Sequence, residues 1–183
     1  GRPWAAVLVA AAMGVQASYY TPFAQWLAQQ GVAVFSFDYR GMGASRPAGS
    51  LRQVQADLDI WLQDQDAALN WLADREGVRG LPLLLLGNSL GAQLAGSLPS
   101  RERLHGLVAV SMGSGYVGHL VPAYQPRARL FLHFFTPLLV ALFGYFPGKR
   151  LGVVGDLPRG AVLQWRRWCL SPQYLLSAEG RHA

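Results

Sequence analysis

The stretch from Leu83 to Gly91, with the sequence LLLLGNSLG, decides the fold class of this 183-residue chain. Four consecutive leucines are typical of a parallel strand that is buried on both faces. Gly87 and Gly91 stand two residues before and two residues after Ser89, and helical spacing resumes from Leu90 to Leu98. A strand that turns sharply into a helix at a serine needs small residues at those two positions, so that strand and helix can approach. The segment therefore predicts an exposed serine on a strand-to-helix turn.

Apolar runs alternate with helical patterns on both sides of this turn. Further strands are predicted at Ala5 to Ala11, Val32 to Phe37 and Leu107 to Ser111, and an amphipathic helix at Val54 to Ala73. Such alternation is typical of βαβ units on a parallel sheet. We expect an α/β fold with a mostly parallel sheet and helices on both faces. Right-handed crossovers then place the third strand between the first and the fourth.

The strand pattern stops after Tyr116, and the chain becomes aromatic, interrupted by prolines and helical as far as Leu176. We expect a core over residues 1–115, a helical cap inserted over 116–176, and a return to the core over 177–183 that is cut short. The apolar run from Leu130 to Phe146 contains His133, Thr136 and Pro137 and is shorter than the about 20 residues that span a bilayer. It is predicted not to be a transmembrane helix.

The net charge of +6 raises the question of nucleic-acid binding. The basic excess lies after residue 100, but its residues stand singly or in pairs, without the dense runs of a nucleic-acid interface. We therefore expect no nucleic-acid partner. Cys169 is the single cysteine, which excludes an internal disulfide and suits a cytoplasmic location. The four aspartates of the predicted 54–73 helix are interpreted as a solvated face, and neither a metal nor a cofactor is expected; they are Asp57, Asp59, Asp64 and Asp66.

A serine hydroxyl attacks a carbonyl only when it is held exposed beside a base and opposite donors for the developing oxyanion. Ser89 is the predicted nucleophile, and the backbone N–H of Leu90 is the expected oxyanion donor. Chance could produce Gly-x-Ser-x-Gly in a chain with 21 glycines, but the motif lies between a predicted strand and a predicted helix. That context favours the catalytic interpretation.

The chain resembles the α/β-hydrolase superfamily. Two motifs and their spacing carry the resemblance: the turn at Ser89, and the loop from Asp38 to Ser45, which reads Asp-x-Arg-Gly-x-Gly-x-Ser. The resemblance implies that Asp38 and Arg40 are structural. It also implies a second oxyanion donor in the loop after the first strand, where the matching amide belongs to Met13. Three later segments are similar to uncharacterised bacterial hydrolases of the esterase, lipase and serine-aminopeptidase type: Ser114 to Tyr116, Phe143 to Gly148, and Asp156 to Pro158.

Triads of this superfamily run in the order serine, acid, histidine. None of the four histidines has the expected position after an acid and a later strand: His105 precedes the fourth predicted strand, His119 and His133 lie in the expected insertion, and His182 is the penultimate residue. They are interpreted as packing or surface residues. We expect the acid and the histidine beyond Ala183 and almost no activity in these 183 residues. Two other interpretations stay open: a non-catalytic binding protein of the same fold, and a membrane-surface protein that uses Leu130 to Phe146 as an anchor.

The expected substrate is a small-molecule ester or thioester with a hydrophobic acyl group. The aromatic part of the predicted cap has more apolar surface than one short helix can hide, and we expect Phe135 and Phe143 to line the acyl pocket over Ser89. Packing within the core is the simpler interpretation of the same side chains. Basic residues of the cap are expected to add a weak contact with a membrane surface. The sequence does not predict the oligomeric state.

Overall fold

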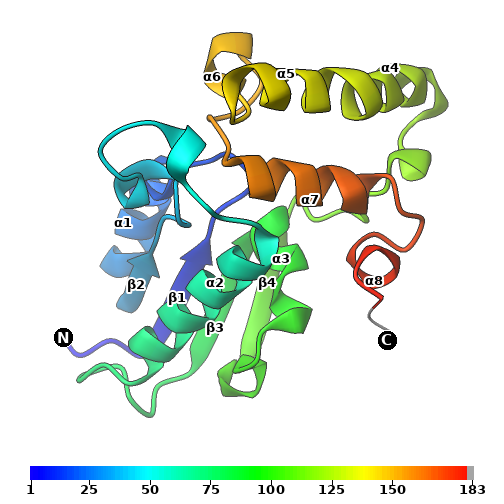
Figure 1. The fold of residues 1–183 in the computed structure, drawn as a ribbon. Helices are drawn as coiled ribbons and strands as arrows, with labels where there is room; N and C mark the ends of the chain where they lie inside the picture. Colours follow the sequence, from blue (N-terminus) through cyan, green and yellow to red (C-terminus); the bar gives the residue numbers. More distant parts are fainter. Residues whose placement is uncertain (181–183) are drawn as a thin grey trace. The chain divides into compact units, whose positions relative to one another are not determined.

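The computed structural model describes residues 1–180 and contains one four-stranded sheet (Figure 1). Its strands are β1 (Ala5–Ala10), β2 (Val32–Ser36), β3 (Leu83–Asn88) and β4 (Gly106–Val110). All neighbours are parallel, and the order is β2-β1-β3-β4. The predicted parallel sheet is confirmed, with the third strand between the first and the fourth.

The register brings the carboxyl ends of β1 and β3 to the same edge of the sheet. Ala10 of β1 pairs with Gly87 of β3, so Ser89 follows directly at that edge. Every residue of β1 is at most 6% exposed, as expected for a central strand with helices on both sides. β4 differs, because it ends the sheet and leaves Leu107 and Val110 at least 40% exposed.

The chain divides into two compact units. The first contains residues 1–46 and 59–112, and the second contains residues 47–58 and 113–183. The sequence analysis did not predict that residues 47–58 pack with residues 113–183 in the second unit. The expected division into a core, a cap over 116–176 and a return at 177–183 stays a prediction, and its last three residues, with His182, lie outside the described part of the chain.

The helices of the first unit flank the sheet. They are α1 (Thr21–Gln29), α2 (Leu58–Ala73), whose first residue lies in the second unit, and α3 (Leu90–Gln93). Pro22 stands in the first turn of α1, where its missing N–H costs no helical hydrogen bond. The helix predicted from Val54 begins only at Leu58, and the one predicted to reach Leu98 ends at Gln93 and is followed by a 3₁₀ turn at Ala95–Ser97.

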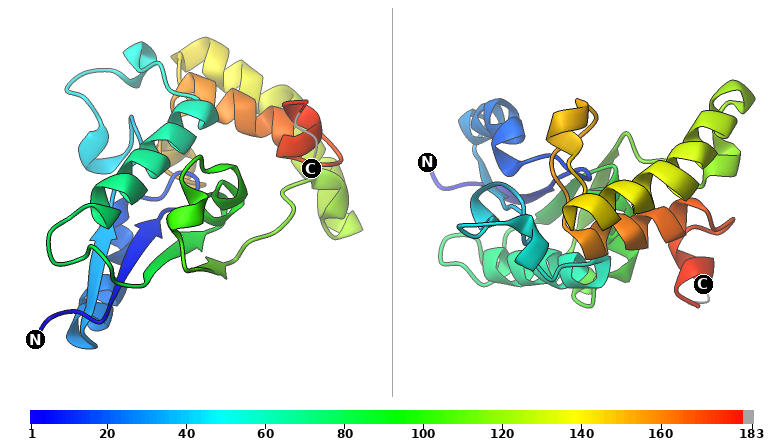
Figure 2. Two further views of the ribbon diagram at one scale, coloured as in Figure 1. Left: turned by 90° about the horizontal axis from the view of Figure 1, so that it is seen from below. Right: turned by 45° about the horizontal axis from the view of Figure 1, so that its top comes forward.

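The second unit is helical, as predicted for most of this region. Its helices are α4 (Gln125–Leu130), α5 (Thr136–Phe143), α6 (Gly148–Leu151), α7 (Arg159–Cys169) and α8 (Leu175–Ala178). In Figure 1 and Figure 2, α4 and α5 form one rod, and α5 lies along α7. The prolines do not break the rod, because a π-helical turn at Phe131–Phe135 joins its two halves.

Pro137 explains the π turn. It has no N–H to donate to the preceding turn, so carbonyl groups there need other partners. The carbonyl of Leu132, which the N–H of residue 137 would serve in a π turn, accepts Nε of Arg166 on α7 instead. The carbonyl of Phe131 accepts the backbone N–H of Thr136 and also, at 3.0 Å, its hydroxyl. The wider turn is thus stabilised by side chains, one of which comes from the neighbouring helix.

The rod is longer than the apolar run that the sequence indicated. It extends over Pro122–Phe143, 22 residues, and by length and composition it could cross a membrane. The sequence analysis took His133, Thr136 and Pro137 as interruptions of a shorter apolar run, whereas the helix continues through all three residues. Core helices of soluble proteins meet the same criterion, so the finding leaves the relation to a membrane open.

Candidate active site

Ser89 occupies a strained turn between β3, which ends at Asn88, and α3, which begins at Leu90. Its backbone φ of 48° and ψ of −110° lie in a region that residues other than glycine rarely adopt. Such a conformation costs on the order of 1–3 kcal/mol and persists only where the surroundings enforce it. One restraint is a backbone hydrogen bond, because the N–H of Ser89 donates to the carbonyl of Val110 on β4 at 2.9 Å.

The two glycines of the turn are required by backbone contacts. A Cβ on Gly87 would lie 2.4 Å from the backbone nitrogen of Ala92, and one on Gly91 would lie 2.3 Å from the carbonyl oxygen of Ala10. Neither partner is a side chain that could move aside. The strand and the helix therefore approach as the sequence analysis argued, and the start of α3 lies against the end of β1.

A buried glutamine on α2 holds α3 in place. The hydroxyl of Tyr39 donates to Oε1 of Gln65 at 2.7 Å, and Nε2 of Gln65 donates to the carbonyl of Gly91 at 3.0 Å. Gln65 is fully buried, and burial raises the pKa of Tyr39, which keeps its hydroxyl protonated as a donor. The sequence analysis missed this residue. The available signal was a polar residue within the apolar stripe of α2 between Leu58 and Leu72.

The loop after β2 is structural, as the resemblance implied. The carboxylate of Asp38 accepts hydrogen bonds from the backbone N–H groups of Ala17 and Ala44, both at 2.8 Å. A Cβ on Gly43 would lie 2.2 Å from that carboxylate. Arg40 is anchored to Asp64 through its backbone N–H at 2.9 Å and its guanidinium at 3.1 Å.

The interpretation of the aspartates of the predicted 54–73 helix as a solvated face was wrong for Asp64 and Asp66. Asp64 holds the Arg40 segment, and Asp66 accepts the backbone N–H of Ser100 at 2.9 Å and its hydroxyl at 3.2 Å. Both carboxylates fasten loops of the first unit to α2. Their spacing on the helix is that of a polar, solvent-exposed face. The loops that cover this face are distant in the sequence, so a local pattern does not indicate them.

The predicted oxyanion donors lie on elements that meet at the sheet edge. Leu90 is the first residue of α3, and the first N–H groups of a helix have no intrahelical acceptor. Met13 lies in the turn after β1, where the N–H of Ala12 donates to the hydroxyl of Tyr20 at 3.1 Å. Their role at Ser89 stays a prediction.

The described histidines form hydrogen bonds with other groups or are exposed. Nδ1 of His105 accepts the N–H of Leu83 at 3.1 Å, at the end of β3 that is farthest from Ser89. His119 forms a 2.7 Å hydrogen bond between Nδ1 and the Ser114 hydroxyl in the second unit. His133 is exposed on the π turn. These positions agree with the interpretation of the histidines as packing or surface residues.

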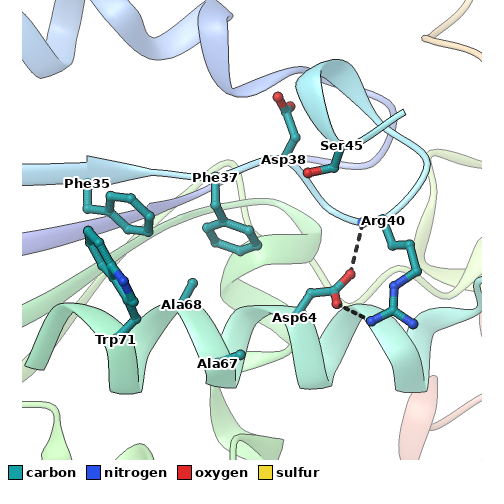
Figure 3. A pocket seen from close by; sticks show the side chains of 9 residues that line it. All are labelled: Phe35, Phe37, Asp38, Arg40, Ser45, Asp64, Ala67, Ala68 and Trp71. Atoms are coloured by element: carbon teal, nitrogen blue, oxygen red, sulfur yellow. Dashed lines mark hydrogen bonds and ion pairs between the residues drawn. The ribbon is translucent and has the colours of Figure 1, made fainter. Parts of the chain in front are cut away.

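A surface pocket of about 520 Å³ lies between β2 and α2 (Figure 3). Its apolar floor includes Phe35 and Trp71, whose rings lie 4.5 Å apart, and its polar end includes Arg40 and Asp64. None of the residues of the turn at Ser89 lines it. The pocket is therefore separate from the candidate nucleophile.

The predicted acyl-wall residues both lie on the rod of the second unit. Phe135 is 44% exposed, and Phe143 is half-buried with the guanidinium of Arg150 5.7 Å from its ring centroid. Their place over Ser89 stays a prediction.

Comparison with known proteins identifies the family. The family model described as serine aminopeptidase, S33, matches residues 1–142, which include every strand and the turn at Ser89. The chain belongs to this family of α/β-hydrolases. The resemblance inferred from the two motifs is thereby confirmed.

Relatives and solved structures extend this result. The uncharacterised protein YfhR of Escherichia coli K12 is 32% identical over 108 residues, which are 59% of this chain and 36% of YfhR. YfhR of Salmonella typhimurium is 35% identical over 74 residues, which are 40% of this chain and 23% of that protein. The chain thus spans about a third or less of the curated relatives that it matches.

Two solved structures share the fold. A soluble variant of monoglyceride lipase from Saccharomyces cerevisiae, in complex with a substrate analog, has a TM-score of 0.62 at 17% identity, and the match covers 96% of this chain and 64% of the lipase. Alpha/beta hydrolase domain-containing protein 10 from mouse has a TM-score of 0.51 at 17% identity, with 97% and 62% covered. At this identity the likeness shows the α/β-hydrolase fold alone.

Proposed function

We propose that Ser89 is the nucleophile of a serine hydrolase that acts on an ester or thioester with a hydrophobic acyl group. The observation that carries the proposal is the backbone of Ser89, which is held at positive φ between two glycines whose neighbours leave no room for a Cβ. This strain has a chemical use, because it presents the hydroxyl beyond the end of the strand, where a substrate can reach it.

In the proposed reaction, Oγ of Ser89 attacks the acyl carbonyl carbon and transfers its proton to a histidine. The N–H groups of Leu90 and Met13 donate to the oxygen that becomes negative. Collapse of this intermediate expels the alcohol or thiol, which takes the proton from the histidine. Water, deprotonated by the same histidine, then attacks the acyl-enzyme, and release of the acid returns a proton to Oγ of Ser89. The base and its acidic partner are proposed to come from the rest of the full-length protein, since this chain matches 64% of the solved lipase.

A fluorophosphonate probe tests the nucleophile in the full-length protein. Labelling should be lost in Ser89→Ala and retained in Ser111→Ala. Ser111 is a matched control, because it is also a serine at positive φ and directly follows β4 on the same sheet. Labelling that survives Ser89→Ala would refute the assignment.

The 183-residue chain by itself should hydrolyse p-nitrophenyl esters barely above background. Loss of triad members lowers the rate by a factor of about 10⁴ to 10⁶. Efficient turnover by this chain would show that one of its own histidines acts as the base.

The acyl preference is tested with p-nitrophenyl esters of increasing chain length. In the full-length enzyme, Phe135→Ala and Phe143→Ala should lower kcat/KM for long-chain esters more than for acetate, because only a long acyl group would reach these rings. Equal losses on both substrates would remove the two residues from the acyl site. Faster cleavage of aminoacyl p-nitroanilides than of any ester would replace the proposal with a peptidase function.

A further inference from the structure

The α4–α5 rod shows three rows of side chains with different exposure. One row is buried and consists of Leu132, Thr136 and Val140. A second row is intermediate apart from Phe135 and contains Phe131, Phe135, Leu139 and Phe143. The third row is exposed by 55%, 56%, 41% and 63% at Leu130, Phe134, Leu138 and Leu142, respectively, and is called the outer row here.

The outer row has the same four-residue step throughout. Four residues overshoot a 3.6-residue turn by roughly 40°, so a long row of this spacing would drift around an ordinary α-helix. The π turn at Phe131–Phe135 has more residues per turn, so each residue rotates less about the axis and part of that drift is cancelled. The four side chains consequently stay on one face over a length of roughly 18 Å, calculated from a rise of about 1.5 Å per residue.

A solvent-facing helix row is normally polar, because the apolar side of an amphipathic helix faces the core. Here the opposite row is the one fixed to the protein, through the packing of α5 on α7 and the hydrogen bond from Arg166 to the carbonyl of Leu132. The outer row therefore exposes four large apolar side chains in line, which is the arrangement of an interaction surface.

Basic residues stand at both ends of the outer row. Arg127 and Arg129 are exposed at its start, and Lys149 and Arg150 are exposed after its end, where Arg150 lies over the ring of Phe143. Between Glu102 and Glu179 the chain has a single acidic residue, Asp156. A surface that combines an apolar strip with positive charge fits a membrane with anionic lipids.

A second copy of the chain fits this surface less well. A two-fold pair of rods would bring Arg127 and Arg129 of one copy to Lys149 and Arg150 of the other, and a parallel pair would place each basic end against its own equivalent. Both arrangements bring like charges together. Spanning the bilayer is also disfavoured, because the buried row is fastened to α7.

We propose that the outer row docks this protein on the surface of a membrane that contains anionic lipids, with the rod lying in the interface and its basic ends at the lipid phosphates. The outer row does not include the two residues of the proposed acyl wall, since Phe135 and Phe143 belong to the second row. The two proposals therefore make separate predictions for neighbouring residues.

Flotation with vesicles tests the docking without any enzymatic readout. The protein should float with phosphatidylcholine vesicles that contain 30 mol% phosphatidylserine, and much less with pure phosphatidylcholine. Arg127→Gln with Arg129→Gln should lower the partition coefficient about thirty-fold, from about fivefold for each charge at an anionic surface. Phe134→Gln with Leu142→Gln should lower it by roughly tenfold for each apolar side chain withdrawn from lipid.

Matched controls come from exposed positions of the first unit. Phe23→Gln with Trp26→Gln replaces two exposed aromatic residues of α1, and Arg2→Gln with Arg46→Gln removes two exposed charges. Both control pairs should bind vesicles as the unchanged protein does. If the Phe134 and Leu142 pair fails to fold by circular dichroism, the Arg127 and Arg129 pair still tests the charge requirement.

Three results would overturn the proposal. They are equal binding to neutral and anionic vesicles, binding that the outer-row and basic-end variants leave unchanged, and sedimentation equilibrium showing a dimer that Phe134→Gln with Leu142→Gln dissociates. The last result would assign the surface to a second copy instead. In none of these cases would the Ser89 labelling result change.

Discussion

Replacing Gln65 with leucine should release α3 from α2. The substitution removes the acceptor of the Tyr39 hydroxyl and the donor to the Gly91 carbonyl, which lie 2.7 Å and 3.0 Å away. Both orphaned groups belong to buried residues. A buried polar group without a partner costs about 1–3 kcal/mol, so Gln65→Leu should lower the free energy of unfolding by about 2–6 kcal/mol.

The double variant separates this cause from a general loss of packing. Tyr39→Phe alone leaves only the Gln65 carbonyl oxygen unsatisfied, at about 1–3 kcal/mol. Gln65→Leu combined with Tyr39→Phe leaves only the Gly91 carbonyl unsatisfied. The double variant should therefore be more stable than Gln65→Leu by about 1–3 kcal/mol, although it carries one more substitution.

Urea unfolding followed by far-UV circular dichroism measures these differences. With a slope of about 2 kcal/mol per molar urea, a difference of about 2 kcal/mol moves the midpoint by about 1 M. Gln63→Leu is the matched control, since Gln63 is exposed on the same helix, and it should change the midpoint little. If the double variant loses as much stability as the two single variants combined, the hydrogen-bond account is refuted.

Three further outcomes are expected. Gly91→Ala should lower the free energy of unfolding by about 1–3 kcal/mol, because the new Cβ would clash with the Ala10 carbonyl. Gly96→Ala is the control and should have little effect, since a Cβ there has nothing within 4 Å. An equal calorimetric Tm in both variants would contradict this prediction. Burial alone would raise the pKa of Glu179, but hydrogen bonds from Trp168, Arg167 and Gln164 outweigh it and hold that pKa below its ordinary value. Ionised Glu179 therefore stabilises the folded protein fully above the ordinary glutamate pKa, and this contribution is lost as the pH falls through the lowered pKa of the folded state. Glu179→Gln should consequently make Tm depend less on pH on the acid side of a Tm-against-pH curve. Burial raises the pKa of the Cys169 thiol to about 12, so a thiol reagent at pH 8 should react only after urea is added, and prompt reaction of the folded protein would show an accessible thiol.

The sheet and the turn at Ser89 were predictable because their signals are local. The leucine run at 83–86 indicates burial on both faces, and Gly87 with Gly91 indicates the close approach that the structure contains. The strand order followed from the handedness of crossovers, which holds for almost all parallel connections.

The missed features depend on partners that are distant in the sequence. The role of Gln65 depends on its hydrogen bonds to Tyr39 and Gly91, each 26 residues away. The continuity of the rod through Pro137 depends on a side chain of α7 that is 34 residues beyond Leu132. Periodicity within a window contains no information on such pairs, and for this reason Pro137 was interpreted as an interruption.

The second unit is built from two separate pieces of chain, and this has a consequence for synthesis on the ribosome. Nε of Arg52 donates to the carbonyl of Phe143, 91 residues later, and the N–H of Leu58 donates to Oε1 of Gln164, 106 residues later. At a translation rate of about 5–20 residues per second, these partners are synthesised roughly 5–20 s after residues 47–58. During that interval their apolar side chains, Leu51 among them, are available to chaperones, so slower translation of the later codons should lengthen chaperone residence on the nascent chain.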